Sequence, residues 1–191
     1  MATNRTYTVP YRRKREGKTD YRTRMKLLLG SKPRIVLRKS SKHVSLQIVE
    51  FHPNGDTVIA SANSSELEKF GWKGGSGNTS AAYLTGMLLA KKAKKNLACV
   101  LDIGQMSSVK GATIYAAAKG CVDGGLQVPF ANEIAPAMAR IRGEHIAQYA
   151  KKLKADKEKY QKQFSGYVKA GFDPENLPVH FDQVKTKIGA Q

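Results

Sequence analysis

Alternation of apolar and polar residues marks the segment from residue 34 to residue 60. Three stretches rich in apolar residues follow one another, at 34–38, 44–49 and 57–60. In the second stretch, apolar Val44, Leu46 and Ile48 alternate with polar Ser45 and Gln47. Because side chains on a strand point alternately to its two faces, this strand has one buried and one wetter face. With the turn sequence at 52–56, the pattern predicts a three-stranded antiparallel meander.

The spacing of apolar residues becomes helical after Asn78, whose side chain offers a capping oxygen. Lysines that complement the negative end of this helix follow at Lys91, Lys92, Lys94 and Lys95. The continuous apolar run 97–101 predicts a strand covered on both faces, and 112–122 predicts a second helix, ended by two glycines. Residues 126–129 are expected to return as a short strand. A meander followed by helix, strand, helix and strand predicts an α/β fold with a mixed sheet.

Beyond residue 136 the chain is polar, with apolar residues at helical spacing. This pattern predicts amphipathic helices separated by Gly171 and Pro174. Three aromatic residues, Tyr160, Phe164 and Tyr167, lie at helical spacing, which favours a packing stripe over a base-stacking platform. The predicted organisation is a basic arm at 1–31, an α/β core at 32–132 and a helical extension at 133–191.

Charge changes this picture, because the chain carries 33 Lys and Arg against 15 Asp and Glu, a net charge of +18. Such an imbalance indicates a polyanionic partner. Between Arg5 and Lys26 there are nine cationic residues against two acids, with Tyr7, Tyr11 and Tyr21 among them. Bases stack on aromatic rings and guanidinium planes, so the segment is typical of an RNA-binding arm that is poorly ordered until it meets RNA. The alternative is a solvated, disordered tail.

A second basic cluster surrounds the turn between the first two predicted strands. It consists of Lys32, Arg34, Arg38, Lys39, Lys42 and His43, with Ser40 and Ser41 in the turn. A hairpin tip of this kind can bind phosphates and 2′-hydroxyls of RNA. The alternative is ordinary protection of an edge strand by charge.

The glycine-rich segment 71–77 leads into the helix after Asn78 but matches neither the Walker pattern nor the dinucleotide-binding pattern. Its backbone N–H groups can still attract an RNA phosphate, with Lys73 adding charge and Trp72 a stacking face. The alternative is a mobile surface loop.

Catalytic and metal-binding patterns are not visible in the sequence. The four histidines, His43, His52, His145 and His180, have no neighbours at metal-ligand spacing. Asp102 ends the predicted buried strand and Asp123 could join it, but a role in capping or orienting neighbouring helices is favoured. The sequence therefore predicts neither an enzyme nor a metal or cofactor site.

Cys99 and Cys121 lie far apart in apolar or alanine-rich surroundings and are expected to be buried thiols in a reduced compartment. Nothing at the start of the sequence resembles a signal peptide, and no apolar run is long enough to span a bilayer. We therefore expect a cytoplasmic protein.

The basic arm and the predicted core also carry recognisable segments: RRKREGKTDYRTR from Arg12, RKSSKH from Arg38, KFGWKGG from Lys69, NTSAAYLTGMLLAKKA from Asn78 and AAKGCVDGGLQVP from Ala117. In this order they resemble the universal 5S-rRNA-binding proteins of the large ribosomal subunit, number eighteen in the bacterial scheme. HIAQYAKKL from His145 and KEKYQKQFSGYVKAGFDPENLP from Lys157 are similar to the archaeal and eukaryotic branch. Two departures are Cys121, where alanine is more usual, and the lack of a long basic tail, which favours an archaeal source.

The resemblance implies a noncatalytic protein that holds 5S rRNA and ties it to the large-subunit rRNA. Its implied neighbours are a second 5S-binding ribosomal protein and other large-subunit proteins, and its implied fold is a three-layer α/β module of ribonuclease-H-like topology. Matching positions are expected to bind RNA: Tyr11, Arg12, Arg13, Lys14, Arg15, Lys18, Tyr21, Arg22, Arg24, Arg38, Lys39, Ser40, Lys42, His43, Trp72, Lys73 and Asn78. Two alternatives stay open, a metal-dependent nuclease of that fold using Asp102 and Asp123, and a nonspecific nucleic-acid-compacting protein.

Overall fold

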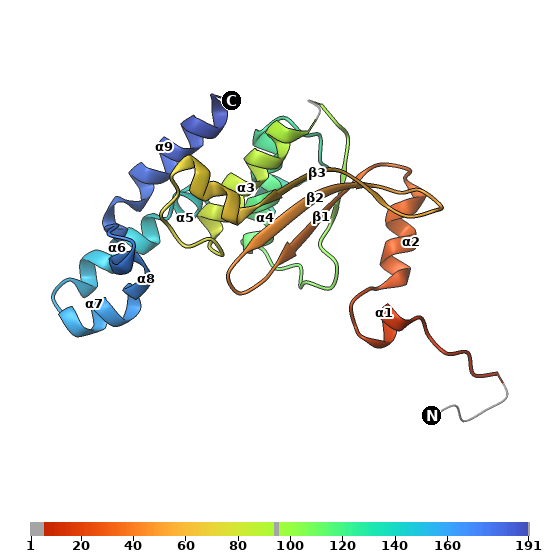
Figure 1. The fold of residues 1–191 in the computed structure, drawn as a ribbon, viewed down its shortest axis with the longest axis horizontal. Coiled ribbons are helices and arrows are strands. Elements are labelled where there is room, and N and C mark those ends of the chain that lie inside the picture. The colour runs from red at the N-terminus through yellow and green to blue at the C-terminus, as the bar shows by residue number, and fades with distance from the viewer. Residues whose placement is uncertain (1–5, 94–95, 191) are drawn as a thin grey trace.

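A four-stranded mixed sheet lies at the centre of the computed structural model, which describes residues 6–93 and 96–190 (Figure 1). Its strands are β1 (Arg34–Lys39), β2 (Val44–Glu50), β3 (Thr57–Asn63) and β4 (Val100–Asp102), in the order β3-β2-β1-β4. β2 pairs antiparallel with β1 and with β3, and β4 pairs parallel with β1. The predicted meander and the α/β class with a mixed sheet are confirmed.

The alternation in β2 places its apolar side chains on one face of the sheet. Val44, Leu46 and Ile48 are buried, whereas Gln47 is exposed. The register continues this apolar face across the sheet, with Leu46 opposite Leu37 of β1 and Ala62 of β3. A bulge between β2 and β3 then shifts the register after Ile48. One face therefore forms the core, and the other face remains open to a second layer.

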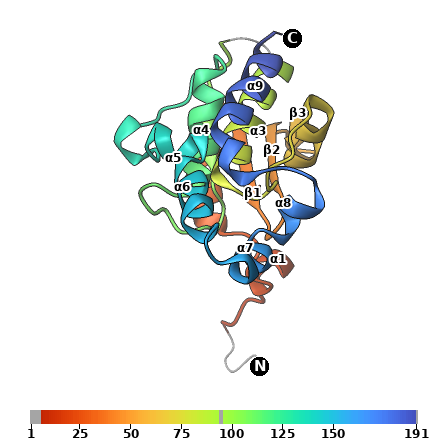
Figure 2. The same cartoon turned by 90° about the vertical axis from the view of Figure 1, so that its left-hand side faces the viewer.

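Two helices cover the apolar face, and Figure 2 shows α3 (Thr79–Lys92) between the strands and α4 (Thr113–Asp123). The predicted cap of α3 is present, since the Asn78 side chain accepts a hydrogen bond from the Ala81 N–H at 2.7 Å. Every residue of α3 from Ser80 to Ala90 is buried. Gly86 and Gly120 have no room for a Cβ, because each lies against the backbone of the other helix. This close approach lets α3 and α4 form successive layers over the sheet.

The prediction for residues 97–101 is only partly right. β4 begins at Val100, and Val100 and Leu101 are half-buried rather than covered on both faces. The expected return strand at 126–129 is reduced to one parallel bridge between Ala98 and Gln127. Pro129 has no N–H to extend this pairing, which gives a physical reason for its early end.

The C-terminal segment beyond residue 131 is helical, as predicted. Its elements are the 3-10 helix η2 (Asn132–Ile134), α5 (Met138–Arg142), α6 (Glu144–Leu153), α7 (Lys157–Gln163), α8 (Ser165–Lys169), η3 (Pro174–Asn176) and α9 (Leu177–Gly189). Leu177, Phe181, Val184 and Ile188 of α9 enter the same core as the sheet and α3. Another 3-10 helix, η1 (Ser64–Phe70), connects β3 to the glycine-rich segment.

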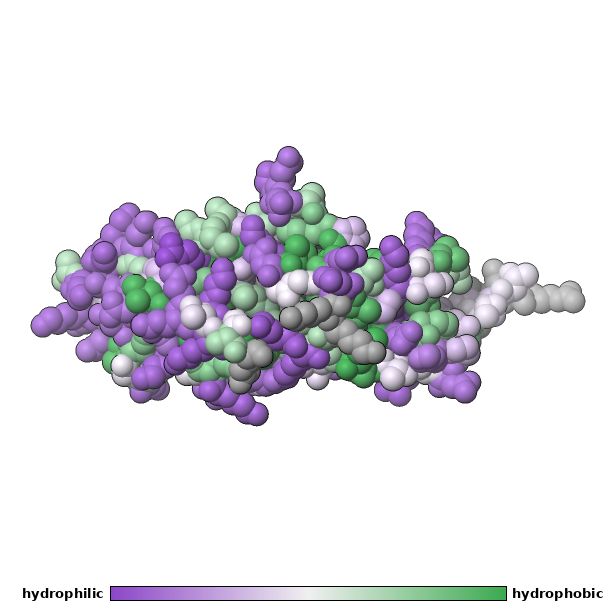
Figure 3. Space-filling model, turned by 90° about the horizontal axis from the view of Figure 1, so that it is seen from above, coloured by the Kyte–Doolittle hydropathy of each residue, from purple (hydrophilic) through white to green (hydrophobic). Residues whose placement is uncertain are grey.

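The aromatic residues at 160, 164 and 167 form a packing stripe, as predicted. Phe164 is buried, and its ring centroid lies 5.2 Å from that of Tyr160 and 5.9 Å from that of Tyr167. Hydrophilic residues cover much of the outer surface of these helices, as seen from above in Figure 3.

The N-terminal arm, expected to be poorly ordered until it meets RNA, is helical in this structure. It forms a short helix α1 (Arg12–Arg15) and a longer helix α2 (Tyr21–Leu29), and the Asp20 side chain caps α2 by accepting from the Arg22 N–H at 2.9 Å. Neither helix contains a buried residue. Arg5 of the predicted arm, and Lys94 and Lys95 of the predicted helix end, lie outside the described residues. Within the described ranges, the helices are too short or too polar to cross a membrane.

Candidate nucleic-acid interface

The cations of the first arm helix, α1, are all presented to solvent. Arg12, Arg13, Lys14 and Arg15 make up α1, and all four are exposed. The Tyr11 carbonyl accepts from the N–H groups of Lys14 and Arg15 at 2.9 and 3.0 Å, which closes this single turn of helix. Four adjacent cations on one turn cannot share a face, so they point around the helix and can reach phosphates on several sides.

Local ion pairs set the geometry of the turn between α1 and α2. Glu16 lies 2.7 Å from Arg12 and 2.8 Å from Lys18, and the hydrogen bond from Arg12, followed by that from Lys18, lowers its pKa. Tyr11 and Tyr21 face each other across the turn with ring centroids 5.2 Å apart. Because Tyr11 is 73% exposed, its ring remains open to a base.

Arg24 of the arm is not a free cation. Its Nη2 atom donates to both oxygens of Asp56, at 3.0 and 2.8 Å, which ties α2 to the start of β3. The other two cations of α2, Arg22 and Lys26, are exposed. The prediction that Arg24 offers its charge to RNA must therefore be corrected, since a carboxylate already occupies its donor group in this structure.

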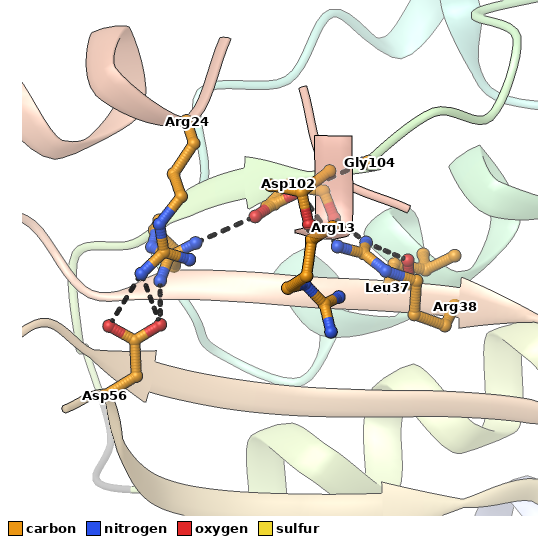
Figure 4. A network of polar contacts seen from close by, with 9 residues as sticks. Arg13, Arg24, Leu37, Arg38, Asp56, Asp102 and Gly104 are labelled. Atoms are coloured by element: carbon orange, nitrogen blue, oxygen red, sulfur yellow. Dashed lines mark hydrogen bonds and ion pairs between the residues drawn. The ribbon is translucent and has the colours of Figure 1, made fainter. Parts of the chain in front are cut away.

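A chain of ion pairs continues from Asp56 across the open face of the sheet (Figure 4). Arg34 is 2% exposed and donates to Asp56 at 2.7 Å and to Asp102 at 2.9 Å. Arg38 donates to the Asp102 carbonyl at 3.0 Å and lies 3.4 Å from its carboxylate. Arg34 thus belongs to the sheet interior and not to the hairpin tip, where its position in the sequence had suggested it would lie.

The hairpin tip presents the rest of the second basic cluster. Lys39, Ser40, Ser41, Lys42 and His43 are all exposed. The tip is closed by hydrogen bonds of the Ser40 N–H to the His43 carbonyl at 2.8 Å and of the His43 N–H to the Ser40 hydroxyl at 3.0 Å. Arg38 is less available than predicted, because its guanidinium also donates to the Leu37 carbonyl at 2.7 Å.

The glycine-rich segment lies beside this tip. A Cβ on Gly77 would be 2.9 Å from the Ser41 carbonyl oxygen, so only glycine permits the approach. Lys73 of the same segment is exposed. The Gly77 contact does not create a phosphate-binding loop, but it brings the glycine-rich segment next to the hairpin tip.

The expectation that Trp72 offers a stacking face is wrong. Trp72 is 4% exposed, and its ring stacks on His180 of α9 with centroids 5.3 Å apart. The Lys73 N–H donates to His180 Nε2 at 3.1 Å, which requires an unprotonated nitrogen. Burial, followed by the nearby charges of Lys187 and Lys73, lowers the pKa of His180 and favours that neutral form. Asn78 likewise serves the cap of α3 rather than presenting its oxygen outward.

The two carboxylates of the nuclease alternative have structural partners. Asp102 binds Arg34 and Arg38 and accepts from the Gly104 N–H at 2.9 Å, whereas Asp123 accepts from the Tyr83 hydroxyl at 2.7 Å. No group of three potential metal ligands occurs among residues 6–93 and 96–190. The favoured reading of both carboxylates as orienting groups agrees with these contacts.

Both cysteines are free and buried, as predicted. Burial raises the pKa of Cys99 to about 11 and that of Cys121 to about 12, so neither side chain is a thiolate at neutral pH.

Sequence reasoning missed a hollow between the arm and the open face of the sheet. Its volume is about 590 Å³, and it brings together arm residues such as Arg13 and Lys18 with Arg38 of the core. Gln47, Val49 and Asp56 also line it. The alternation in β2 indicated that one face of the sheet is polar and open, but it could not show that the arm lies over this face.

Comparison with known proteins agrees with these features. A family model described as ribosomal large subunit proteins 60S L5 and 50S L18 matches residues 5–98 and 91–131. The large ribosomal subunit protein uL18 of Thermofilum pendens is 50% identical over 191 residues, which cover 98% of this chain and 97% of that protein. The chain belongs to the family of ribosomal large-subunit proteins 60S L5 and 50S L18.

Proposed function

We propose that this ribosomal protein binds 5S rRNA and attaches it to the large-subunit rRNA, beside a second 5S-binding ribosomal protein. The observation that carries the proposal is the arm, which lies at one end of the molecule and presents exposed cations on two helices (Figure 1). These helices bury no residue of their own, so packing of an apolar core is not their role. Exposed arginines and lysines at this density suit a phosphate backbone.

The proposed contacts form two groups. The first is the arm, with Tyr11, Arg12, Arg13, Lys14, Arg15, Lys18, Tyr21 and Arg22. The second is the hairpin tip with the neighbouring loop, and comprises Lys39, Ser40, Lys42, His43 and Lys73. Cations position the RNA through its phosphates, while Tyr11 and the tip hydroxyls can recognise unstacked bases and 2′-hydroxyls. Trp72 and Asn78 are left out because both serve internal packing or capping.

Family membership makes the chain a structural constituent of the large ribosomal subunit, and the family is not one of enzymes. The nuclease alternative finds no support, since the guanidinium groups that hold Asp102 would compete with a metal ion for the same oxygens. The remaining rival is a nonspecific polycation that compacts any nucleic acid. It differs from the proposal in one measurable respect, which is selectivity among RNAs of equal charge density.

A competition assay separates these two possibilities. Labelled 5S rRNA is bound to the full chain and challenged with tRNA or duplex DNA, and the same titration is repeated with a chain lacking residues 1–26. We expect the full chain to prefer 5S rRNA at least tenfold over both competitors and the shortened chain to lose most of its affinity. Contact with six to ten phosphates would lower affinity by about 10³–10⁵ between 50 and 200 mM salt. If tRNA and duplex DNA compete as well as unlabelled 5S rRNA does, the proposal is refuted.

A further inference from the structure

The hollow beneath the arm has the size of a small-ligand site. Its volume of about 590 Å³ lies within the range of about 300–1,000 Å³ that such sites occupy. One wall is the arm, with Arg13, Thr19 and Leu27, and the other is the open face of the sheet, with Val36 and Gln47. Figure 4 shows Arg13 reaching from the arm over the strands, close to Arg38.

The sheet wall combines an apolar patch with polar groups because of the strand register. Val36 of β1 pairs with Gln47 of β2, and Arg34 pairs with Val49, which in turn pairs with Val58 of β3. These side chains all line the hollow, and Val58 remains 50% exposed. An aromatic base could lie on the valines, while Gln47 offers both an amide donor and an amide acceptor for its edge.

One donor in this wall has no partner. The Nε atom of Arg34 is buried and makes no hydrogen bond within the described residues, although Arg34 is 2% exposed and its other nitrogens bind Asp56 and Asp102. A buried N–H without an acceptor is unfavourable. The guanidinium that lines the hollow thus keeps one donor unsatisfied within the described residues.

The charge of the lining selects the kind of ligand. Five cationic side chains line the hollow against the carboxylates of Asp20, Asp56 and Asp102. All three carboxylates are already occupied, by the cap of α2 and by the arginine network. Arg13 donates to the Thr19 hydroxyl, and Lys18 pairs with the exposed Glu16 outside the lining. The charge left over for a ligand is therefore positive, is carried chiefly by Arg13, and favours an anion.

We infer that the hollow receives one unpaired nucleotide of the bound RNA, with its base against the valine patch and its phosphate toward Arg13 and Lys18, an inference that rests on the proposed function. An acidic segment of a protein is the competing occupant, and the crosslinking experiment below separates it from a nucleotide. Phosphate contacts along the arm position the RNA, and this single nucleotide adds recognition of a base that the exposed cations cannot provide.

Filling the hollow tests this role. In Gln47→Trp an exposed side chain is replaced by one that occupies the space of the base, and Ser61→Trp is a matched control. Ser61 is exposed and pairs with Gln47 in the sheet register, yet it does not line the hollow. We expect Gln47→Trp to weaken 5S rRNA binding ten- to hundredfold and Ser61→Trp to change it less than threefold, with both variants unfolding at the wild-type temperature.

Photocrosslinking of the wild-type chain gives a second measurement that needs no variant. 5S rRNA carrying 4-thiouridine is irradiated in complex with the full chain, and crosslinked peptides are identified by mass spectrometry. We expect an adduct on the peptides of β1 or β2 from one position of the RNA. Crosslinks confined to the arm and hairpin tip, or equal affinity of Gln47→Trp and wild type, would overturn the inference while 5S selectivity stands. A wild-type chain that binds tRNA as well as 5S rRNA would overturn the proposed function itself.

Discussion

Replacing Asp102 by Asn tests the arginine network that joins the arm, the sheet and the end of β4. The substitution keeps the size of the side chain but removes the charge that faces Arg34 at 2.9 Å and Arg38 at 3.4 Å. Arg34 is 2% exposed and cannot move into water without opening the sheet, so the loss of its partner leaves a buried cation with Asp56 alone.

The magnitude follows from the burial of the two partners. Removing one member of a buried ion pair costs about 3–5 kcal/mol, because the remaining charge stays desolvated. Asp56 still compensates Arg34 in part, and its own side chain is 26% exposed. We therefore expect Asp102→Asn to lower the free energy of unfolding by about 2–3 kcal/mol, below the full range for an isolated buried pair.

Urea unfolding monitored by circular dichroism measures this change, with Glu158→Gln as a control carboxylate on the exposed surface of α7. The control is expected to stay within about 0.5 kcal/mol of wild type. In an Arg34→Met background the effect of Asp102→Asn should fall by at least about 1 kcal/mol, because the two side chains are directly coupled. A loss below about 0.5 kcal/mol in the wild-type background would refute the view that this network stabilises the fold.

Three other outcomes follow from the packing. Gly120→Ala places a methyl group against the backbone carbonyl of Tyr83 and should lower the free energy of unfolding by about 3 kcal/mol, measured in urea. The control Gly166→Ala places its methyl group in open space and should not destabilise the chain. Equal effects of the two substitutions would contradict the close contact between α3 and α4. Because burial lowers the pKa of His180, the unfolded chain takes up a proton first as the pH falls below about 6.5, so stability is full above that pH and declines below it. Thermal unfolding from pH 7.5 to 5 should show a shallower decline in His180→Phe, and an unchanged slope would exclude this cause. Because Trp72 is buried, iodide should quench its fluorescence poorly, with or without RNA. Strong quenching after RNA is added would contradict the burial of this ring in the RNA-bound protein.

The meander and the two core helices could be predicted because their signals are local. Alternation around Leu46 fixed the buried face of β2, Asn78 supplied the cap of α3, and Gly124 ended α4. The strand near residue 100 was predicted too long, since a run of apolar residues does not tell how far its neighbours extend to pair with it.

The arm helices and the ionic network could not be predicted in the same way. Asp20 before Tyr21 is a genuine helix-start signal, but the surrounding cations favoured an arm that is poorly ordered until it meets RNA. Arg34 and Asp102 are 68 residues apart and meet only through the parallel pairing of β1 with β4. The burial of Trp72 also depends on residues far away in the sequence. Its glycine-rich surroundings suggested exposure, whereas α9, more than a hundred residues later, covers its ring.

The most direct test of the central claim compares two chains that lose the same number of cations in different places. One carries Arg12, Arg13, Lys14 and Arg15 changed to Gln, and the other carries Lys151, Lys152, Lys157 and Lys162 changed to Gln, all exposed residues. The affinity of each for 5S rRNA is measured at equal salt by filter binding. We expect the arm variant to lose at least a hundredfold in affinity and the C-terminal variant less than tenfold. Equal losses would contradict a specific grip by the arm and leave only a dependence on total charge.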